Sequence, residues 1–382
     1  MSLDKKYQKK TILQVVPALI SGGVERGTLE IAKSVVKAGH KSIVVSAGGP
    51  MVESLVDNGS EHITLNVASK NPIVIWANAR KIANIIRSRN IDIIHARSRA
   101  PAWSCYLAAK ATNTKLITTF HGIYNFKNFL KKYYNSVMTE GQSVIAVSNF
   151  VKKHIIDNYK VVPNKIIVIH RGVDHREFSK ENLSEDKLSR YKEKYKIPPN
   201  TPVLLLPSRF TRWKGHMVLI EALEKIRHLN FYCIMAGDLA KHPTYVSCIK
   251  EKIHQYKLQS HIQLFGNEPD MVSLYGISDI VLSTSIEPEA FGRTIIEAQA
   301  MEKLVIATNI GGACETIQDG LNGFHVEPND SIELAQKIEH CLSLIGSEQQ
   351  KNMTMNARKT ASENFSLEKM LKNTLAVYDQ ID

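Results

Sequence analysis

Short apolar segments alternate along the chain with longer segments of helical periodicity. The short segments are rich in Val and Ile, and in the longer ones apolar residues return every three or four positions. This alternation is typical of a parallel β-sheet with helices on both faces. In the first half, strands are expected at residues 11–16, 42–46, 91–95, 116–120, 143–147 and 165–169, and helices at 27–38, 73–89 and 102–111.

A change of composition divides the chain at residues 176–200, where Lys, Glu, Ser and Asn dominate and which end in Pro198-Pro199-Asn200. Such a stretch is typical of a polar connector between domains. Beyond it, strands are expected at 203–206, 231–235, 262–265, 279–282 and 304–308, and helices at 217–227, 245–256, 271–275, from 294, and from about 331 onwards. The sequence therefore predicts an α/β protein of two Rossmann-like, doubly wound domains that face a central cleft.

Composition narrows the class of protein. A chain of 382 residues with 43% apolar and 23% charged residues is long enough for two globular domains and is neither disordered nor collagen-like. Its five cysteines are scattered without a C-x-x-C pair, so we expect a reducing cytoplasm rather than a disulfide framework or a zinc site. Lysines at 5, 6, 9 and 10 precede an apolar run as in a signal peptide, but Gln14 and Pro17 interrupt that run, which is therefore expected to be a buried strand.

Charge is distributed unevenly. Residues 1–185 carry 27 Lys and Arg against 13 Asp and Glu, whereas the remainder carries 22 against 24. This excess suggests an anionic partner for the first domain, such as nucleic acid, a phosphorylated lipid or the cytoplasmic membrane surface; a basic face that only aids solubility is the alternative. Residues 126–134 mix Phe and Tyr with Lys, which suits a membrane interface or acceptor lipid, single-stranded nucleic acid, or an ordinary amphipathic helix.

Two acids stand eight positions apart in the stretch from Ser283 to Met301. Glu289 is expected in a loop after a strand, and Glu297 about one turn into the following helix. Both carboxylates would then flank a helix N-terminus at the carboxyl end of a strand, where open α/β sheets bind phosphorylated ligands. The alternative is a capping box from Thr294 to Glu297, with Glu289 as a solvated loop acid.

Two cations follow the first strand of the second half. Arg209 and Lys214 are five positions apart, and fixed cations at a strand end can neutralise a diphosphate leaving group without a metal. Arg212 is expected in solvent, and surface basic residues near Trp213 are the alternative for the pair. Because the chain contains no D-x-D motif, a diphosphate site bridged by a metal is not expected.

Glycines and histidines at other strand ends are further candidates. Gly22 and Gly23 follow the first strand, where glycines let backbone N–H groups approach a phosphate. They form neither G-x-G-x-x-G nor a Walker motif, so a dinucleotide dehydrogenase is disfavoured, and a plain tight turn is the alternative. His121 closes another strand and could contact a sugar hydroxyl or a developing charge, or be structural; His95 and His170 are weaker candidates of the same kind.

Together these residues resemble glycosyltransferase family 4, the retaining group 1 transferases of the two-domain GT-B architecture. The resemblance covers nearly the whole chain. Its most specific part is Glu289-Ala-Phe-Gly-Arg-Thr-Ile-Ile-Glu297 together with Arg209 and Lys214-Gly. Further matches are Gly22-Gly23-Val-Glu25, Thr-Phe-His121-Gly, Val-Ile-Ala-Val-Ser148, Gly172-Val-Asp174 before Phe178, Gly237, Phe265-Gly266, Ser278-Asp279, Gly311-Gly312 with Glu315, and Asp319-Gly-Leu-Asn-Gly323.

The resemblance implies roles for these residues. Arg209 and Lys214 would bind the donor diphosphate, together with backbone amides near Gly22 and Gly23. Glu297 would hold the ribose hydroxyls. The donor sugar would be bound by Glu289 and by the backbone N–H groups of Phe291 and Gly292, and His121 would lie beside it.

The resemblance also implies an activity. A hexose would pass from a nucleotide diphosphate sugar, with retention, to a lipid-linked glycan acceptor such as lipopolysaccharide core. The leaving diphosphate would take the acceptor proton, and no metal or cofactor is expected, since the nucleotide sugar is a substrate.

Residues 1–178 would bind acceptor, residues 179–365 would bind donor, and a helix in 366–382 would pack back on the first domain. The protein would be cytoplasmic and peripheral on the inner face of the plasma membrane, with no nucleic-acid partner expected.

Two departures from the family pattern concern specificity. Arg171 stands where Asn commonly precedes Gly-Val-Asp, so it could contact a phosphorylated acceptor, as could Arg97. Arg293 stands where an apolar residue is usual, which puts the donor-sugar preference in question. The alternatives to a transferase are a basic module with an inert cleft that binds nucleic acid or a membrane surface, and a nucleotide-sugar epimerase of the same fold.

Overall fold

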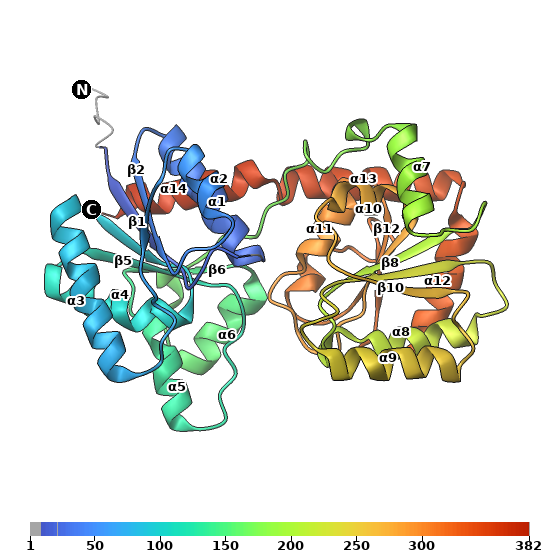
Figure 1. Ribbon diagram of the computed structural model, residues 1–382, viewed down its shortest axis with the longest axis horizontal. Helices are drawn as coiled ribbons and strands as arrows, with labels where there is room; N and C mark the ends of the chain where they lie inside the picture. The colour runs from blue at the N-terminus through green and yellow to red at the C-terminus, as the bar shows by residue number, and fades with distance from the viewer. Residues whose placement is uncertain (1–8, 21, 382) are drawn as a thin grey trace. The chain divides into compact units, whose positions relative to one another are not determined.

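The structure is a computed structural model that describes residues 9–20 and 22–381. Lys5 and Lys6, part of the segment that imitates a signal peptide, lie outside these residues. The described chain forms two compact units (Figure 1): unit 1 contains the residues up to His170 and from Met370 onwards, and unit 2 runs from Arg171 to Lys369. The sequence placed the domain boundary at residue 178, and the binding roles assigned to the two domains stay predictions.

Unit 1 is built on a seven-stranded parallel sheet of order β3-β2-β1-β4-β5-β6-β7. Its central strands are short and almost wholly buried, as expected of a sheet covered on both faces. The strands are β1 (Thr11–Val15), β2 (Lys41–Ser46), β3 (Glu61–Thr64), β4 (Ile93–Ala96), β5 (Lys115–Phe120), β6 (Ser143–Ala146) and β7 (Ile166–Val168).

Helices cover both faces of this sheet. They are α1 (Gly23–Lys37), α2 (Val52–Asp57), α3 (Pro72–Arg89), α4 (Arg99–Thr112), α5 (Phe129–Ser136), α6 (Asn149–Tyr159) and the later part of α14 (Leu367–Gln380). Because parallel crossovers are right-handed and the chain reverses direction across the sheet between β3 and β4, α1 and α2 cover one face and α3 to α6 the other (Figure 1). Local signals set the helix ends: α3 begins after Asn71, whose side chain accepts from Ile73 N–H, and ends at the left-handed Asn90.

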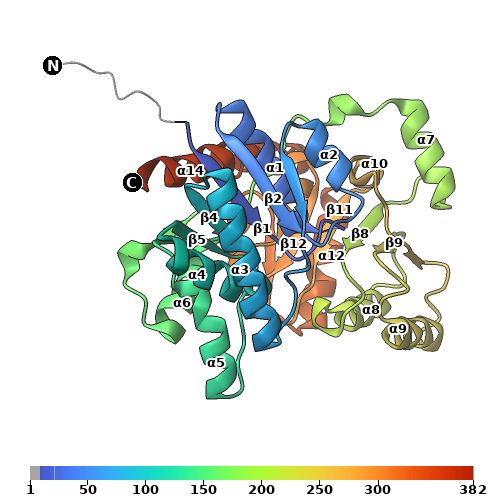
Figure 2. The ribbon, with the colours of Figure 1, turned by 60° about the vertical axis from the view of Figure 1, so that its left-hand side comes forward.

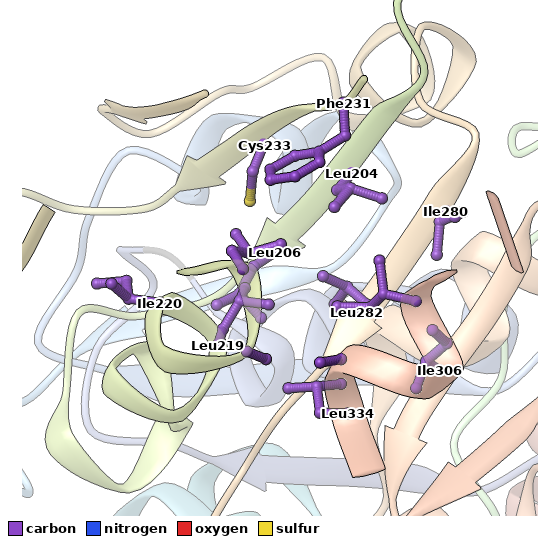
Figure 3. Packing of buried hydrophobic residues seen from close by; sticks show 14 of the residues in the cluster. Leu204, Leu206, Leu219, Ile220, Phe231, Cys233, Ile280, Leu282, Ile306 and Leu334 are labelled. Carbon is purple, nitrogen blue, oxygen red and sulfur yellow. The ribbon is translucent and has the colours of Figure 1, made fainter. Parts of the chain in front are cut away.

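Unit 2 contains a six-stranded parallel sheet of order β10-β9-β8-β11-β12-β13. Its strands are β8 (Val203–Pro207), β9 (Tyr232–Ala236), β10 (Ile262–Phe265), β11 (Ile280–Ser283), β12 (Leu304–Thr308) and β13 (Phe324–Val326). Its helices are α7 (Glu185–Lys194), α8 (His216–Lys225), α9 (Pro243–Gln255), α10 (Met271–Gly276), α11 (Arg293–Ala300), α12 (Ser331–Leu344) and α13 (Glu348–Asn364). The core between the sheet and α8 and α12 includes Leu206, Leu219 and Leu334 (Figure 3).

The polar stretch 176–200 contains more structure than a connector. Helix α7 lies within it and begins after Ser184, whose side chain accepts from Lys187 N–H. Phe178 and Tyr195 are buried, and the Tyr195 hydroxyl donates to Glu268 at 2.7 Å. The stretch is therefore part of unit 2, because its few apolar residues reach the core while its lysines and glutamates stay outside.

No helix in the described part of the chain combines the length and apolar character that a bilayer span requires. The expected strands and longer helices are present within a few residues of their expected bounds. The sequence pattern did not predict β3, β13, α2, α6 or α7, which are short or carry mixed or wholly polar faces.

Candidate active site

Four of the predicted residues follow two neighbouring strands at their carboxyl ends. Arg209 and Lys214 follow β8, and Glu289 and Glu297 follow β11. In the order β10-β9-β8-β11-β12-β13 the chain leaves β8 toward one edge of the sheet and β11 toward the other. The β8/β11 junction is thus the topological switch point of unit 2, where open α/β sheets bind ligands.

Lys214 and Glu289 form an ion pair at this junction. The Lys214 Nζ and Glu289 Oε1 atoms are 2.6 Å apart, and each side chain is only 13% exposed. Ser285 Oγ donates to the same carboxylate. Burial alone would raise the pKa of Glu289, but Lys214, Ser285 and the positive charge of Arg209 hold that pKa below its usual value. Glu289 is therefore a carboxylate at neutral pH.

Backbone contacts between two loops place this ion pair. The Ile286 N–H donates to Trp213 O at 2.8 Å, and Thr284 Oγ1 donates to Lys214 O at 3.0 Å. Gly215 adopts φ +73°, and a Cβ built there would lie 1.8 Å from Thr284 O. Only glycine lets the loop after β8 approach the loop after β11 this closely.

The Trp213 ring lies close to both predicted cations. The Arg209 Cζ is 5.5 Å and the Lys214 Nζ 4.4 Å from its ring centroid. Arg209 is exposed, whereas Lys214 is half-buried. The indole holds two positive charges near one another by cation–π attraction, an arrangement suited to an anion that carries more than one negative charge.

Glu297 is not a helix cap. Helix α11 begins after Gly292 without a side-chain cap, and Glu297 lies in its second turn, so the alternative of a capping box from Thr294 to Glu297 is not formed. Its carboxylate instead accepts from the Tyr275 hydroxyl at 3.0 Å and lies 3.4 Å from Arg293 Nη2. Arg293 therefore neutralises Glu297, and the remaining lone pairs of the carboxylate are available to hydroxyl donors.

Two adjacent glycines hold the loop that precedes α11. Gly312 N–H donates to Glu289 O at 2.7 Å, and Gly311 pairs with Glu289 through an isolated bridge. A Cβ at Gly312 would lie 2.1 Å from Ala290 O. Phe291 is buried with its ring 5.5 Å from that of Phe365, and Gly292 adopts φ +88°. The backbone of the predicted sugar-binding loop is therefore fixed from both sides.

Unit 1 carries the predicted residues that remain, at the carboxyl ends of its own strands. Gly22 precedes α1 with φ +121°, and Gly23 is the first residue of that helix. His121 follows β5 directly and is half-buried. The roles of these three residues in donor binding stay predictions.

His95 is a structural residue rather than a ligand candidate. Its ring is fully buried and bonds Tyr378 Oη at 2.6 Å through Nδ1 and Thr119 Oγ1 at 2.7 Å through Nε2. Burial and the neighbouring Arg97 hold its pKa well below its ordinary value, so the imidazole is neutral.

The two arginines suggested for the acceptor are both buried. Arg97 follows β4 and is 1% exposed, and among the described residues its Nε and Nη2 atoms have no hydrogen-bond partner. Burial lowers its pKa to about 10 despite the opposing influence of Tyr378 and Glu30. Arg171 is the first residue of unit 2 and is also buried. Their contact with an acceptor stays a prediction.

Three residues that support the site were not predicted from the sequence. Trp213 was noted only as a neighbour of the cations, although its place between Arg212 and Lys214 was a usable signal. Ser285 precedes Glu289 by four positions, a loop spacing that predicts no contact. Tyr275 lies on α10, and no sequence pattern connects it to Glu297. Within the described residues, no group of three His, Cys, Asp or Glu side chains is placed to hold a metal ion.

Comparison with known proteins identifies the family. The model of glycosyltransferase family 4 matches residues 21–177, and the model of group 1 glycosyl transferases matches residues 189–360. The chain is 26% identical over 363 residues to N-acetyl-alpha-D-glucosaminyl L-malate synthase of Bacillus anthracis, with 91% of each chain covered.

Solved structures give the same result. A glycosyltransferase from Rickettsia africae is 56% identical, with a TM-score of 0.92 over 98% of this chain and 99% of that one. HepE of Anabaena, in complex with UDP-glucose, is 24% identical, with a TM-score of 0.83 over 96% and 99% of the two chains, and shows the shared fold. The resemblance predicted from the motifs is thereby confirmed: the chain belongs to the group 1, family 4 glycosyltransferases and has the GT-B fold.

Proposed function

We propose that the protein transfers a hexose, with retention of configuration, from a nucleotide diphosphate sugar to a lipid-linked glycan such as lipopolysaccharide core. The observation that carries the proposal is the Lys214–Glu289 ion pair beside Arg209 at the switch point of unit 2. It combines the two groups that a glycosyl donor needs, namely fixed positive charge for a diphosphate and a carboxylate for sugar hydroxyls.

The cations would stabilise the leaving group. A lysine ammonium has three donors, so Lys214 can keep its bond to Glu289 and donate to a phosphate oxygen as well. Arg209 is exposed, with its Cζ 5.5 Å from the Trp213 ring centroid, and adds a second, planar donor. Charge that develops on the diphosphate would thus be neutralised by side chains, which is why we propose a reaction independent of a metal.

The chemical step would proceed on one face of the sugar. The bond from the anomeric carbon to the diphosphate oxygen breaks, and the acceptor oxygen forms its bond to that carbon on the same side. The acceptor proton passes to the departing phosphate oxygen, so no protein base is required. Glu289 would hold sugar hydroxyls, and Glu297, neutralised by Arg293, would accept from the ribose hydroxyls.

The donor class draws support from HepE, which was solved with UDP-glucose. For the acceptor, the excess of Lys and Arg in residues 1–185 favours an anionic molecule at the inner face of the plasma membrane, where the protein would be cytoplasmic and peripheral. The Bacillus anthracis relative is an N-acetyl-alpha-D-glucosaminyl L-malate synthase, and L-malate is also an anion but a small molecule. A lipid-linked and a small carboxylate acceptor are therefore the two arms of the test.

The donor is tested first, by thermal-shift measurements against UDP-, GDP- and ADP-sugars. A bound donor raises the apparent Tm by mass action, and at a concentration about 100 times its Kd the stabilisation is about 2.7 kcal/mol. The stabilising donor is then incubated with lipopolysaccharide core acceptors or with L-malate, and nucleoside diphosphate release is measured. We expect release that depends on the lipid-linked acceptor.

Lys214→Ala supplies the matched test of mechanism. Removing one charge from the leaving-group site is expected to lower kcat by about 100- to 1000-fold. Lys250→Ala, which removes an exposed lysine of α9, is the control and is expected to retain turnover. Full turnover in Lys214→Ala would reject the assigned role. Recovery of isomerised donor without transfer would favour an epimerase, and the absence of any donor shift would favour a binding module without catalysis.

A further inference from the structure

One face of unit 1 is formed by α3, α4 and α5, and we call it the α3–α5 face. Helix α4 joins the other two: Ser104 Oγ donates to Ile75 O of α3 at 3.1 Å, and Trp103 Nε1 donates to Tyr134 O of α5 at 2.9 Å. Two views show the three helices together on one side of the sheet, opposite α1 and α2 (Figures 1 and 2).

Exposed apolar side chains gather on this face. It carries six of the twelve large apolar side chains that are exposed in the described part of the chain: Ile73, Val74, Trp76, Phe129, Leu130 and Tyr133. Phe129 and Leu130 open helix α5 and are 78% and 75% exposed. Of the eight residues of α5, Phe129, Leu130, Lys131 and Tyr133 are exposed and Asn135 alone is buried, so half of the helix faces solvent. Neighbouring apolar groups exposed in this way mark an interaction surface.

The same face is strongly positive. None of the three helices contains an acidic residue, and together they carry eight Lys and Arg, of which Arg89 pairs with Glu61 of β3 at 2.9 Å. The segments between the helices contain one acid, Asp92. The Asp92 carboxylate accepts from Thr11 N–H at 2.7 Å, at the amino-terminal edge of the sheet. Lys127 and Lys131 are exposed on either side of Phe129 and Leu130. Apolar side chains flanked by lysines favour binding to a partner whose interior is apolar and whose surface is anionic.

A pocket of ≈ 500 Å³ lies between α3 and α4. Ala79, Ala83 and Ala111 leave the space, and Trp76 and Leu107 add apolar walls. Arg80 also lines the pocket, with its Cζ 3.4 Å from the Trp76 ring centroid, as does Arg87, two turns further along α3. An apolar recess with two guanidinium groups fits the phosphate and upper acyl chain of an acidic lipid.

We propose that the α3–α5 face docks the protein on an anionic lipid surface, with Phe129 and Leu130 inserted among the acyl chains. The exposed lysines beside them contact lipid phosphates, and the pocket between α3 and α4 receives one acidic lipid. This inference rests on the proposed function, because a lipid-linked acceptor must be reached at a membrane.

Flotation with vesicles of phosphatidylglycerol and phosphatidylcholine tests the charge contribution. Lys127→Ala combined with Lys131→Ala is expected to weaken binding about 30-fold, since each cation near an anionic surface contributes about fivefold. The matched control removes two exposed lysines of α1, on the other side of the sheet, by Lys33→Ala combined with Lys37→Ala. It is expected to lose less than a few-fold. Equal losses in both pairs would overturn the assignment of the face.

Salt separates the apolar contribution from the electrostatic one. Phe129→Ser combined with Leu130→Ser is expected to lower vesicle binding at low and at high salt, whereas the effect of the lysine pair fades as salt screens the charges. Vesicles with brominated acyl chains show which tryptophan contacts the lipid. They are expected to quench protein fluorescence, and Trp76→Phe is expected to remove most of that quenching. Unchanged quenching in Trp76→Phe would reject the lipid-filled pocket.

The Tm shift caused by the donor distinguishes failure of the docking proposal from failure of the proposed function. All of these variants lie outside the candidate active site, so their Tm shift with the stabilising donor should equal that of the unaltered protein. A full donor shift without vesicle binding would overturn the docking face and leave the transferase proposal intact. Binding of single-stranded RNA through Lys127 and Lys131, with no vesicle binding, would also overturn it.

Discussion

Two ionisable residues near the switch point of unit 2 differ in charge: Glu289 is ionised and His216 is neutral. Glu289 is charged because Lys214 and Ser285 contact it directly. His216 is fully buried at the start of α8, where burial first and the charge of Lys214 second lower its pKa to about 4. Its Nε2 bonds Ser208 Oγ at 3.1 Å, and its ring stacks on Phe210 at 4.9 Å. A neutral imidazole therefore packs beneath the cationic loop without adding charge.

This arrangement predicts a pH-dependent stability. The unfolded state binds a proton at His216 below about pH 6.5, but the folded state binds it only near pH 4. Stability from the neutral imidazole is therefore complete above pH 6.5 and is lost as the pH falls toward 4, by about 3 kcal/mol in all. His216→Leu keeps the apolar packing and should remove that dependence.

The measurement is the free energy of unfolding by denaturant at several values between pH 7 and pH 4. His242→Leu is the control, because His242 is exposed at the start of α9 and its substitution should leave the slope unchanged. An undiminished slope in His216→Leu would show that other groups cause the loss of stability in acid.

The chemical residues of the site could be predicted from sequence, but their supporting contacts could not. Arg209, Lys214, Glu289 and Glu297 each follow a strand, and strand ends meet at one edge of a parallel sheet. The hydroxyl of Tyr275, which bonds Glu297, comes from another element and has no spacing rule. The burial of His95 is likewise set by α14, which is distant in sequence.

At the scale of elements, the sequence predicted what hydrophobic periodicity encodes. Buried strands such as β8 are continuous apolar runs, and long helices such as α3 carry a regular apolar stripe. Helix α7 was not predicted because it has no buried residue and its composition is that of a linker. The alternative of a capping box in α11 is not realised because the helix begins at Arg293, so Thr294 is its second residue and not its N-cap. The Glu297 carboxylate bonds Tyr275 and pairs with Arg293 instead.

The close approach of the two active-site loops predicts a strong effect of one methyl group. In Gly215→Ala the new Cβ would meet Thr284 O at a φ of +73°, so the loop carrying Lys214 must move away from Glu289. We expect weaker donor binding, by tenfold or more, and a loss of about 1–3 kcal/mol of stability. Isothermal titration with the donor and denaturant unfolding measure the two effects.

Gly266→Ala is the control for this substitution. Gly266 lies in the same unit, has no positive φ, and a Cβ there would meet nothing within 4 Å. It should leave both donor affinity and stability within the usual range of surface substitutions, about 0.5 kcal/mol. If Gly215→Ala changed donor affinity and stability no more than Gly266→Ala does, neither property would depend on the close contact between the two loops.

At the scale of the whole molecule, unit 1 is completed by the end of the chain. Residues from Met370 onwards belong to it, although unit 2 separates them from the rest in sequence. The Tyr378 hydroxyl contacts the His95 ring on β4, and Lys10 Nζ donates to the carbonyl oxygens of Tyr378 and Ile381 at 2.9 Å each. The residue before β1 and the end of α14 are thus bonded to each other, so the full stability of unit 1 requires residues 370–381.

Tyr378→Phe tests this closure. The substitution keeps the ring but leaves Nδ1 of His95, which is fully buried, without its partner, at an expected cost of about 1–3 kcal/mol. Hydrogen exchange followed by mass spectrometry should show faster exchange in β1, β4 and β5, while the strands of unit 2 keep their protection. Tyr133→Phe, which removes an exposed hydroxyl of α5, should change neither unit. Amide hydrogens of the two units exchange at separate rates only if each unit has its own core. If exchange became equally fast in both sheets, α14 would stabilise the whole molecule as one cooperative unit and not unit 1 alone.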